Sequence, residues 1–137
     1  MPTVIFEFLI PQRPVSLQTK NRKNLQAWKT FVNNEAAKTW PVNALPFVGD
    51  LRVTLVYLAA DDAADVDNII KPIVDALVGM VYQDDFAVCD VDCHRRFLSD
   101  PIDMTDLPLL LQAGVVIAHE CIYVRVSDAI ELKDYLS

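Results

Sequence analysis

The sequence predicts an α+β fold in a single domain that spans residues 1–137, with a mixed β-sheet of four to five strands and helices packed on one face. Segments with the two-residue alternation of strands are separated by segments with the 3.6-residue spacing of amphipathic helices. The strand-like segments lie far apart in the chain, which excludes a doubly wound parallel array. A chain of 137 residues buries roughly two-thirds of its unfolded surface as one unit, so a second domain is not expected.

The first half of the chain predicts two strands and one helix. Thr3–Ile10 is rich in β-branched and aromatic residues and stops at Pro11, which is typical of a strand. From Asn21 to Trp40 the apolar residues keep helical spacing, which predicts an amphipathic helix that packs on the sheet. Leu51–Leu58 alternates and becomes apolar on both faces at its end, which indicates an interior strand.

The next predicted helix contains a proline. Regular helix is expected from about Asn68, because Pro72 is tolerated only in a first turn, where its missing N–H has no intrahelical partner. The remaining predicted elements are a strand at 88–97, a helix at 106–118, a strand at 120–126 and a short polar tail from Ser127. In the strand at 88–97 the residues expected to face the core are Cys89, Val91, Cys93 and Phe97.

The charge of the chain is negative and unevenly distributed. It carries 12 Lys and Arg against 19 Asp and Glu, a formal net charge of −7, which argues against undirected binding to nucleic acid. Residues 1–40 nevertheless carry a net charge of +4, whereas residues 61–106 hold twelve aspartates against three cations. This polarity suits a basic docking edge beside an acidic metal pocket. The alternative is a solvated acidic face on a protein that never meets DNA.

The chain is expected to be cytoplasmic and to have no membrane partner. No apolar run approaches the ~20 residues of a spanning helix, and no basic region precedes a long apolar segment at its start. Cys89 and Cys93 lie four residues apart in a predicted strand, about 13 Å, which is too far for a disulfide bond. Reduced cysteines in a reducing compartment are therefore expected.

The densest cluster of chemically active side chains lies in the stretch DVDNIIKPIVDALVGMVYQDD, from Asp65 to Asp85. Asp65 and Asp67 stand at the entrance of the predicted helix, and Lys71 lies four residues beyond Asp67 on the same helix face. If the helix and the following strand fold back as a hairpin, Asp85 returns near the two leading aspartates. Three converging carboxylates are the hard oxygen ligands with which proteins hold magnesium or manganese for phosphate chemistry.

Helix and turn chemistry offers another interpretation of these residues. An aspartate before a helix is an ordinary N-cap, and the pair Asp84 and Asp85 is ordinary in a turn. Lys71, flanked by acidic residues, could form a surface ion pair that contributes little. A cap needs only one carboxylate, however, so capping does not account for both Asp65 and Asp67.

Three cations lie at the start of the predicted helix from Asn21 to Trp40. They are Lys20, Arg22 and Lys23, which stand where the helix dipole is already positive. An external anion would relieve this crowding of positive charge, and helix N-termini with added Lys and Arg bind phosphate readily. These residues are therefore candidates for contact with a DNA backbone, with a solvated helix start as the alternative.

The segment DVDNIIKPIVDALVG, followed by VYQDDFAV, resembles the signature of the RusA-type Holliday-junction resolvases, which are magnesium-dependent, structure-selective DNA endonucleases. Weaker similarity extends to residues 14–22 and to the strand around 123–126. The resemblance implies that Asp65, Asp67 and Asp85 hold Mg²⁺, with Mn²⁺ as a possible substitute, and that Lys71 stabilises charge on the phosphate or orients the attacking water. Whether Asp84 or Asp85 is the third ligand stays open.

The resemblance also implies a homodimer, because paired nicks across a two-fold junction need two sites related by symmetry. The predicted function is accordingly a divalent-metal-dependent endodeoxyribonuclease that resolves four-way junctions in DNA recombination and repair. Its partner is branched DNA, contacted by Lys20, Arg22, Lys23 and Lys71. One alternative is a non-catalytic binding protein whose acidic surface meets a basic partner. The other is a metal-dependent nuclease that acts on RNA, since the chemistry at phosphorus is the same.

Overall fold

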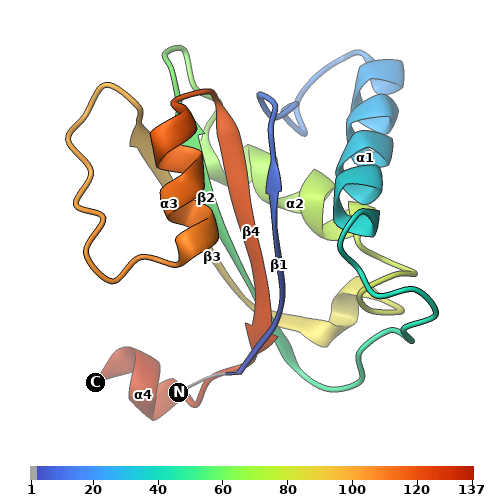
Figure 1. Cartoon of the computed structure of the whole chain (residues 1–137). Coiled ribbons are helices and arrows are strands. Elements are labelled where there is room, and N and C mark those ends of the chain that lie inside the picture. Colours follow the sequence, from blue (N-terminus) through green and yellow to red (C-terminus); the bar gives the residue numbers. More distant parts are fainter. Residues whose placement is uncertain (1–2) are drawn as a thin grey trace.

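The computed structural model describes residues 3–137, and in it four strands form one mixed sheet in the order β1-β4-β2-β3, with helices beside it (Figure 1). The predicted α+β class is thus confirmed. Along the chain the elements are β1 (Val4–Ile10), α1 (Arg22–Ala37), β2 (Leu51–Ala59), α2 (Val66–Ala76), the 3₁₀ turn η1 (Asp85–Ala87), β3 (Val88–Phe97), α3 (Leu109–Ile117), β4 (Cys121–Asp128) and α4 (Leu132–Leu136).

The sheet combines antiparallel and parallel pairs. β4 runs antiparallel to both β1 and β2, whereas β3 runs parallel to β2. Parallel neighbours need a crossover connection, and α2 provides it between Ala59 and Val88. The chain folds back after α2, as expected, because Asp85 lies beside Lys71 of α2, and the strand that follows then runs parallel to β2.

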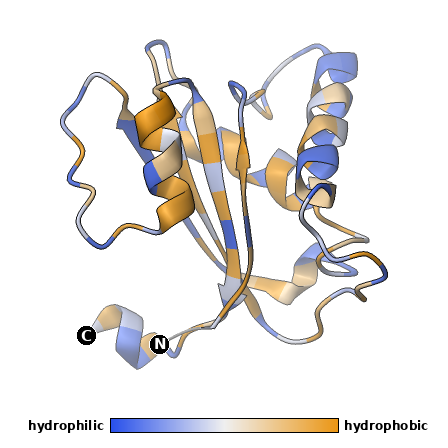
Figure 2. Cartoon of the chain, in the orientation of Figure 1, coloured by the Kyte–Doolittle hydropathy of each residue, from blue (hydrophilic) through white to orange (hydrophobic). Residues whose placement is uncertain are grey.

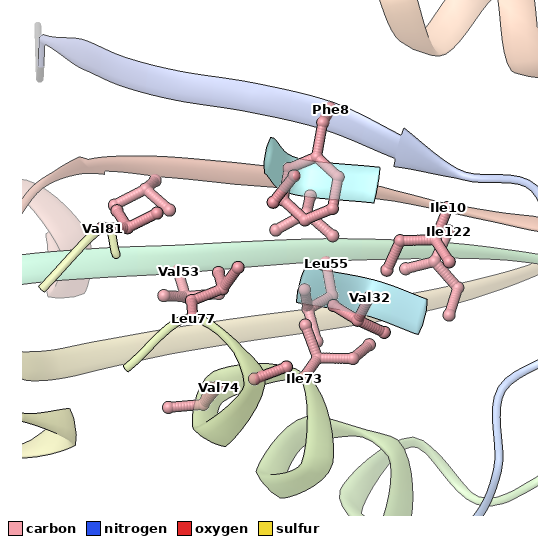
Figure 3. Close-up of a cluster of buried hydrophobic side chains, with 14 of the residues drawn as sticks. Phe8, Ile10, Val32, Val53, Leu55, Ile73, Val74, Leu77, Val81 and Ile122 are labelled. Atoms are coloured by element: carbon pink, nitrogen blue, oxygen red, sulfur yellow. The ribbon is translucent and has the colours of Figure 1, made fainter. Parts of the chain in front are cut away.

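Two helices cover one face of the sheet, as predicted. Every second residue of β2 from Leu51 points towards α1 and α2 and is fully buried, because side chains alternate between the faces of a strand. Figure 3 shows Leu55 of β2 meeting Val32 of α1 and Ile73 of α2 in this core, which excludes water from the base of the helices. The hydropathy colouring of Figure 2 shows α1 as a mixture of hydrophilic and apolar residues, as expected of a helix with one buried side.

The prediction placed the helices on one face of the sheet, whereas the third helix, α3, packs on the opposite face. There Leu111 joins a second apolar cluster with Leu58, Cys121 and Tyr123. Figure 2 shows α3 as largely apolar. The apolar residues on both faces of β2 near its end therefore correspond to two cores, one under each helical layer.

Helix α2 begins earlier than the sequence predicts. It starts at Val66, with Asp65 as the N-cap residue, so Pro72 lies inside the helix rather than in its first turn. Pro72 has no N–H to donate to the carbonyl of Asn68, four residues before it. The Leu17 N–H donates to that oxygen instead, at 2.8 Å. A contact from outside the helix thus removes the penalty that the sequence pattern implied.

Strand β3 contains a bulge that the sequence pattern does not reveal. Leu51 pairs with Val88 and Arg52 pairs with Asp90, so Cys89 has no partner directly opposite it on β2. Cys89 is exposed, and its predicted orientation towards the core is wrong for this reason. The other three predicted residues share the face of β2 that carries the core, where Cys93 and Phe97 pack against it and Val91 remains 41% exposed.

The end of the chain is more ordered than a polar tail. β4 continues to Asp128, and α4 follows it. Tyr135 of α4 lies under the guanidinium of Arg52, 5.3 Å from the ring centroid, so this short helix is fixed against the sheet. None of the helices in residues 3–137 is long and apolar enough to cross a membrane.

Candidate active site

An open hollow of about 270 Å³ lies between α2 and β3, on the face of the sheet that α1 and α2 cover. Its polar lining consists of Asp67 and Lys71 from α2 and of Asp85 from η1. Its apolar lining is formed by Ile70 and Val74 of α2 and by Val88 and Val91 of β3. The hollow thus combines two carboxylates and one ammonium group on an apolar base.

Helical spacing explains why the α2 residues line the hollow together. Asp67, Ile70, Lys71 and Val74 are separated by three or four residues and therefore share one face of the helix. On β3 the bulge at Cys89 has the same effect. It lets Val88 and Val91, three residues apart, both face α2, although a regular strand would turn them to opposite sides.

Lys71 is the charged centre of this site. Its Nζ atom donates to Asp85 Oδ2 at 2.6 Å and lies 2.8 Å from Asp75 Oδ1. Asp75 is also 3.5 Å from Lys29 of α1. The hydrogen bonds to Asp75 and Asp85 raise the pKa of Lys71 above its ordinary value, so the side chain remains an ammonium ion at neutral pH. Lys71 is therefore suited to stabilise negative charge.

The two aspartates of the D-D pair have different surroundings. The Asp84 carboxylate accepts a hydrogen bond from the Phe86 N–H at 2.9 Å and so caps η1. Asp85 lines the hollow instead, where the hydrogen bond from Lys71 is the main cause that lowers its pKa. Turn chemistry thus accounts for Asp84 and leaves Asp85 on the hollow.

The two aspartates at the start of α2 are exposed, and N-capping does not explain them. Asp65 occupies the N-cap position, yet its side chain makes no capping hydrogen bond. Asp67 lies in the first turn and lines the hollow. Both carboxylates stand near the positive end of the helix dipole, which stabilises their negative charge.

The carboxylates have the right chemistry for a hard divalent cation, since Asp67 and Asp85 present oxygen ligands to one hollow. Within residues 3–137 no three His, Cys, Asp or Glu side chains lie close enough together to enclose a metal ion. Asp65 does not line the hollow, and Asp85 is bonded to Lys71. The arrangement is thus two carboxylates that line one hollow, with Asp65 two residues before Asp67 in the sequence.

The predicted docking residues lie at the start of α1 and are exposed. Lys20, Arg22 and Lys23 form no ion pair with any residue in the described part of the chain. Asn21 caps the helix by accepting from the Asn24 N–H at 3.0 Å, and no acidic residue follows in the first turn. The bond from the Leu17 N–H to Asn68 of α2 lies three residues ahead of the first of these cations, so the chain that enters α1 is attached to the start of α2.

Sequence reasoning missed contributors that come from distant segments. Lys29 reaches Asp75 from α1, and Arg13 bonds to the loop that precedes Asp65. Neither residue stands in a motif, and no local spacing connects either one to the site. Only the packing of α1 and of its leading segment on α2 brings them there.

Comparison with known families finds a match over residues 11–102, about two-thirds of the chain, to the family described as Endodeoxyribonuclease RusA. The matched range contains the segment before α1 and all elements from α1 to β3, so it includes every residue of the hollow. No curated protein sequence matches the chain significantly.

Proposed function

The chain belongs to the RusA family of endodeoxyribonucleases, and on that premise we propose that it is a divalent-metal-dependent nuclease that resolves four-way DNA junctions in recombination and repair. The observation that carries this proposal is the meeting of Asp67, Lys71 and Asp85 around one hollow. Residues from two elements of the β2–β3 crossover, α2 and η1, supply opposite charges to a place that is open to a large substrate.

Asp65, Asp67 and Asp85 are the residues that would hold Mg²⁺, or Mn²⁺ in its place, because carboxylate oxygens are the ligands that these ions prefer. Once bound, the ion would stabilise charge on the scissile phosphate and lower the pKa of a bound water. The surplus of carboxylate over cation in this part of the chain supports such a site, since a bound cation offsets the repulsion among them.

Lys71 has the position and charge to stabilise the scissile phosphate. Its side chain is half exposed, so a phosphate oxygen can reach the ammonium group from the open side of the hollow. Asp75, which is held by Lys29, keeps a contact with Lys71 and orients it. An ammonium group aimed at the place where negative charge develops lowers the barrier to cleavage.

Binding of the DNA backbone is assigned to the start of α1 together with Lys71. Lys20, Arg22 and Lys23 present positive charge three to six residues beyond Leu17, whose N–H is bonded to Asn68 of α2, and this suits a strand that passes from the docking edge into the hollow. A homodimer is part of the proposal, because two symmetric cuts in a four-way junction require two sites related by a two-fold axis.

The test is a cleavage panel with the purified full chain. Labelled four-way junction, linear duplex, single-stranded DNA and RNA of the same sequence are incubated with MgCl₂ or with EDTA, and sedimentation measures the oligomeric state. We expect paired nicks in the junction, in magnesium only, from a dimer. Cleavage of RNA in preference to the junction would identify the RNA nuclease. Binding without any cleavage in either Mg²⁺ or Mn²⁺ would identify a non-catalytic protein.

A further inference from the structure

Arg13 joins the loop after β2 to the start of β4. Its guanidinium donates to the carbonyl oxygens of Asp61 and Asp62, the first at 3.4 Å, and lies 3.5 Å from Glu120 Oε1. The other oxygen of Glu120 accepts from the Tyr57 hydroxyl at 2.9 Å. Because Glu120 is largely buried and Tyr57 fully so, the guanidinium is anchored to a fixed part of the sheet.

The loop that Arg13 holds is the one that delivers Asp65 and Asp67. Within it Asp62 has a φ of 48°, in the left-handed region, where a non-glycine residue needs support from its surroundings. The planar fork of a guanidinium can donate to two neighbouring carbonyl oxygens and a carboxylate at once. A lysine carries the same charge but cannot reproduce this planar arrangement of donors.

Pro72, four residues after Asn68, gives rise to a second attachment, which is made at the Asn68 carbonyl. A proline has no N–H, so the Asn68 carbonyl receives no bond from the next turn of α2, and the Leu17 N–H takes its place at 2.8 Å. Pro72 is itself buried, so the position is fixed by packing as well. The proline therefore exposes an acceptor to the segment that precedes α1.

We propose that the segment Pro11–Leu17 fastens the aspartate-bearing turn on both sides, with Arg13 and Pro72 as positioning residues for Asp65 and Asp67. Arg13 holds the chain just before the two aspartates, and the Asn68 carbonyl exposed by Pro72 holds it just after them. This inference rests on the proposed function, because the fastening matters for cleavage only if these carboxylates take part in it.

Arg13 differs in this respect from the cations at the start of α1. Its two terminal nitrogens are engaged by Asp61, Asp62 and Glu120, whereas Lys20, Arg22 and Lys23 have no ionic partner within residues 3–137. A phosphate contact would have to share the guanidinium with these internal bonds, which fix its orientation. Substitution of Arg13 should therefore affect the rate of cleavage rather than the affinity for DNA.

Amide hydrogen exchange on the free protein tests the fastening without any substrate. Pro72→Ala restores a competing N–H, and loss of one hydrogen bond should speed exchange of the Leu17 amide roughly fivefold. Arg13→Gln should similarly speed exchange of the Asn68 amide, which donates to the Asp65 oxygen at 3.0 Å. Pro101→Ala and Arg96→Gln, both at exposed positions on the far side of the sheet, serve as matched controls.

Single-turnover cleavage at saturating junction tests the consequence. Arg13→Gln, Arg13→Lys and Pro72→Ala should each cut roughly tenfold more slowly, because a displacement of about 1 Å at reacting groups can cost up to ~100-fold. Junction affinity in EDTA and its salt dependence should stay at the wild-type values. A purely structural role would instead lower the melting temperature without this separation of rate from affinity.

Three results would overturn the inference: unchanged exchange in the variants, faster exchange with unchanged cleavage, or a loss of junction affinity in Arg13→Gln that Arg13→Lys restores. If the wild-type chain cuts no nucleic acid, the proposed function fails separately, and titration with Mn²⁺ replaces the cleavage assay. Weaker Mn²⁺ binding in the variants then supports the fastening, and unchanged Mn²⁺ binding rejects it.

Discussion

The edge strand β3 borders a cation–carboxylate cluster on each of its two faces, and the two clusters differ in how far their charged groups are partnered and buried. The Lys71 cluster consists of Asp67, Lys71, Asp75 and Asp85 and lies against α2. The Arg52 cluster consists of Arg52, Asp90, Asp92 and Tyr135 and lies beside α4, where it surrounds a smaller hollow of about 160 Å³.

In the Arg52 cluster each charged group has a partner. Arg52 pairs with Asp92, and their side chains are only 18% and 11% exposed. The Tyr135 hydroxyl donates to the other Asp92 oxygen at 3.3 Å. Asp90 accepts from the Ile130 N–H at 3.2 Å. These bonds attach α4 to the sheet, so the cluster stabilises the fold.

In the Lys71 cluster carboxylates outnumber cations and the groups are more exposed. The side chains of Lys71 and Asp85 are 50% and 39% exposed, so their ion pair contributes little to stability in water. Within the described residues the Asp67 carboxylate has no hydrogen-bond or ion-pair partner. The comparison teaches that partnered, largely buried charge serves as an attachment, whereas the exposed Asp67 without a partner has no such role in the fold.

The strongest way to break this comparison is to remove one negative charge from each cluster in turn. Asp85→Asn keeps the size of the side chain but weakens the hold on a metal, so cleavage of a four-way junction in magnesium should slow at least ~100-fold, about 2.7 kcal/mol of barrier. Binding in EDTA should stay at the wild-type affinity or tighten, since a carboxylate that repels phosphate is gone. Rates come from single-turnover cleavage and affinities from gel shift.

Asp92→Asn is the matched control in the Arg52 cluster, and it should cut at the wild-type rate when assayed below its melting temperature. Lys71→Ala should also cut slowly but without any gain in binding, because it removes a favourable charge. If Asp85→Asn keeps the wild-type rate, Asp85 is not a functional residue, and Asp84 becomes the candidate third ligand.

The second prediction concerns stability, for which the Arg52 cluster should matter more than the Lys71 cluster. Asp92→Asn leaves the half-buried Arg52 guanidinium without its charged partner and weakens the attachment of α4. The free energy of unfolding should fall by about 1–3 kcal/mol, which lowers the melting temperature by several degrees. Asp85→Asn, in the exposed pair, should leave it nearly unchanged. Thermal melts of both variants in EDTA decide the order, and a larger loss in Asp85→Asn would contradict the comparison.

The class of fold and the shared helix face of Asp67 and Lys71 could be predicted from the sequence, because both depend on local spacing. Alternation identified β2, and the separation of four residues put Asp67 and Lys71 on one helix face. What failed depends on distant partners. The helix start was predicted too late because the N–H that replaces the one missing at Pro72, that of Leu17, belongs to another segment. The bulge at Cys89 is defined by how β3 pairs with β2, and no pattern within the sequence of β3 indicates it.

The same limit applies to the candidate site. The D-D pair alone does not distinguish Asp84 from Asp85, since either aspartate can cap a turn. The distinction requires the Phe86 N–H, which is bonded to Asp84, and the Lys71 ammonium, which is bonded to Asp85. Charge surplus was visible in the sequence, but the exposure that separates a ligand site from a structural ion pair was not.

The third prediction asks whether the surplus of carboxylates binds a cation. If Mg²⁺ binds only the folded protein, ten times its dissociation constant should add roughly 1.4 kcal/mol to the free energy of unfolding and raise the melting temperature by a few degrees. Mn²⁺ should do likewise. Asp65→Asn and Asp67→Asn should each lose the response, whereas Asp92→Asn should melt earlier but keep it. A wild-type melting temperature that does not move across millimolar Mg²⁺ would argue against a formed site.

The smallest expected effect distinguishes the two faces of the sheet in DNA binding. Neutralising Lys20, Arg22 or Lys23 one at a time should lower the slope of log affinity against log salt by about 0.9, because each phosphate contact releases about one counterion. At physiological salt this is roughly a fivefold loss of affinity for each variant. Arg96→Gln, an exposed cation on the far face, removes the same charge and should leave the slope unchanged. Measurement by fluorescence anisotropy in EDTA from 50 to 200 mM salt keeps cleavage out of the assay. If Arg96→Gln lowers the slope and the three α1 variants do not, the DNA lies on the α3 side of the sheet, and the open hollow beside Lys71 would not be where the strand enters.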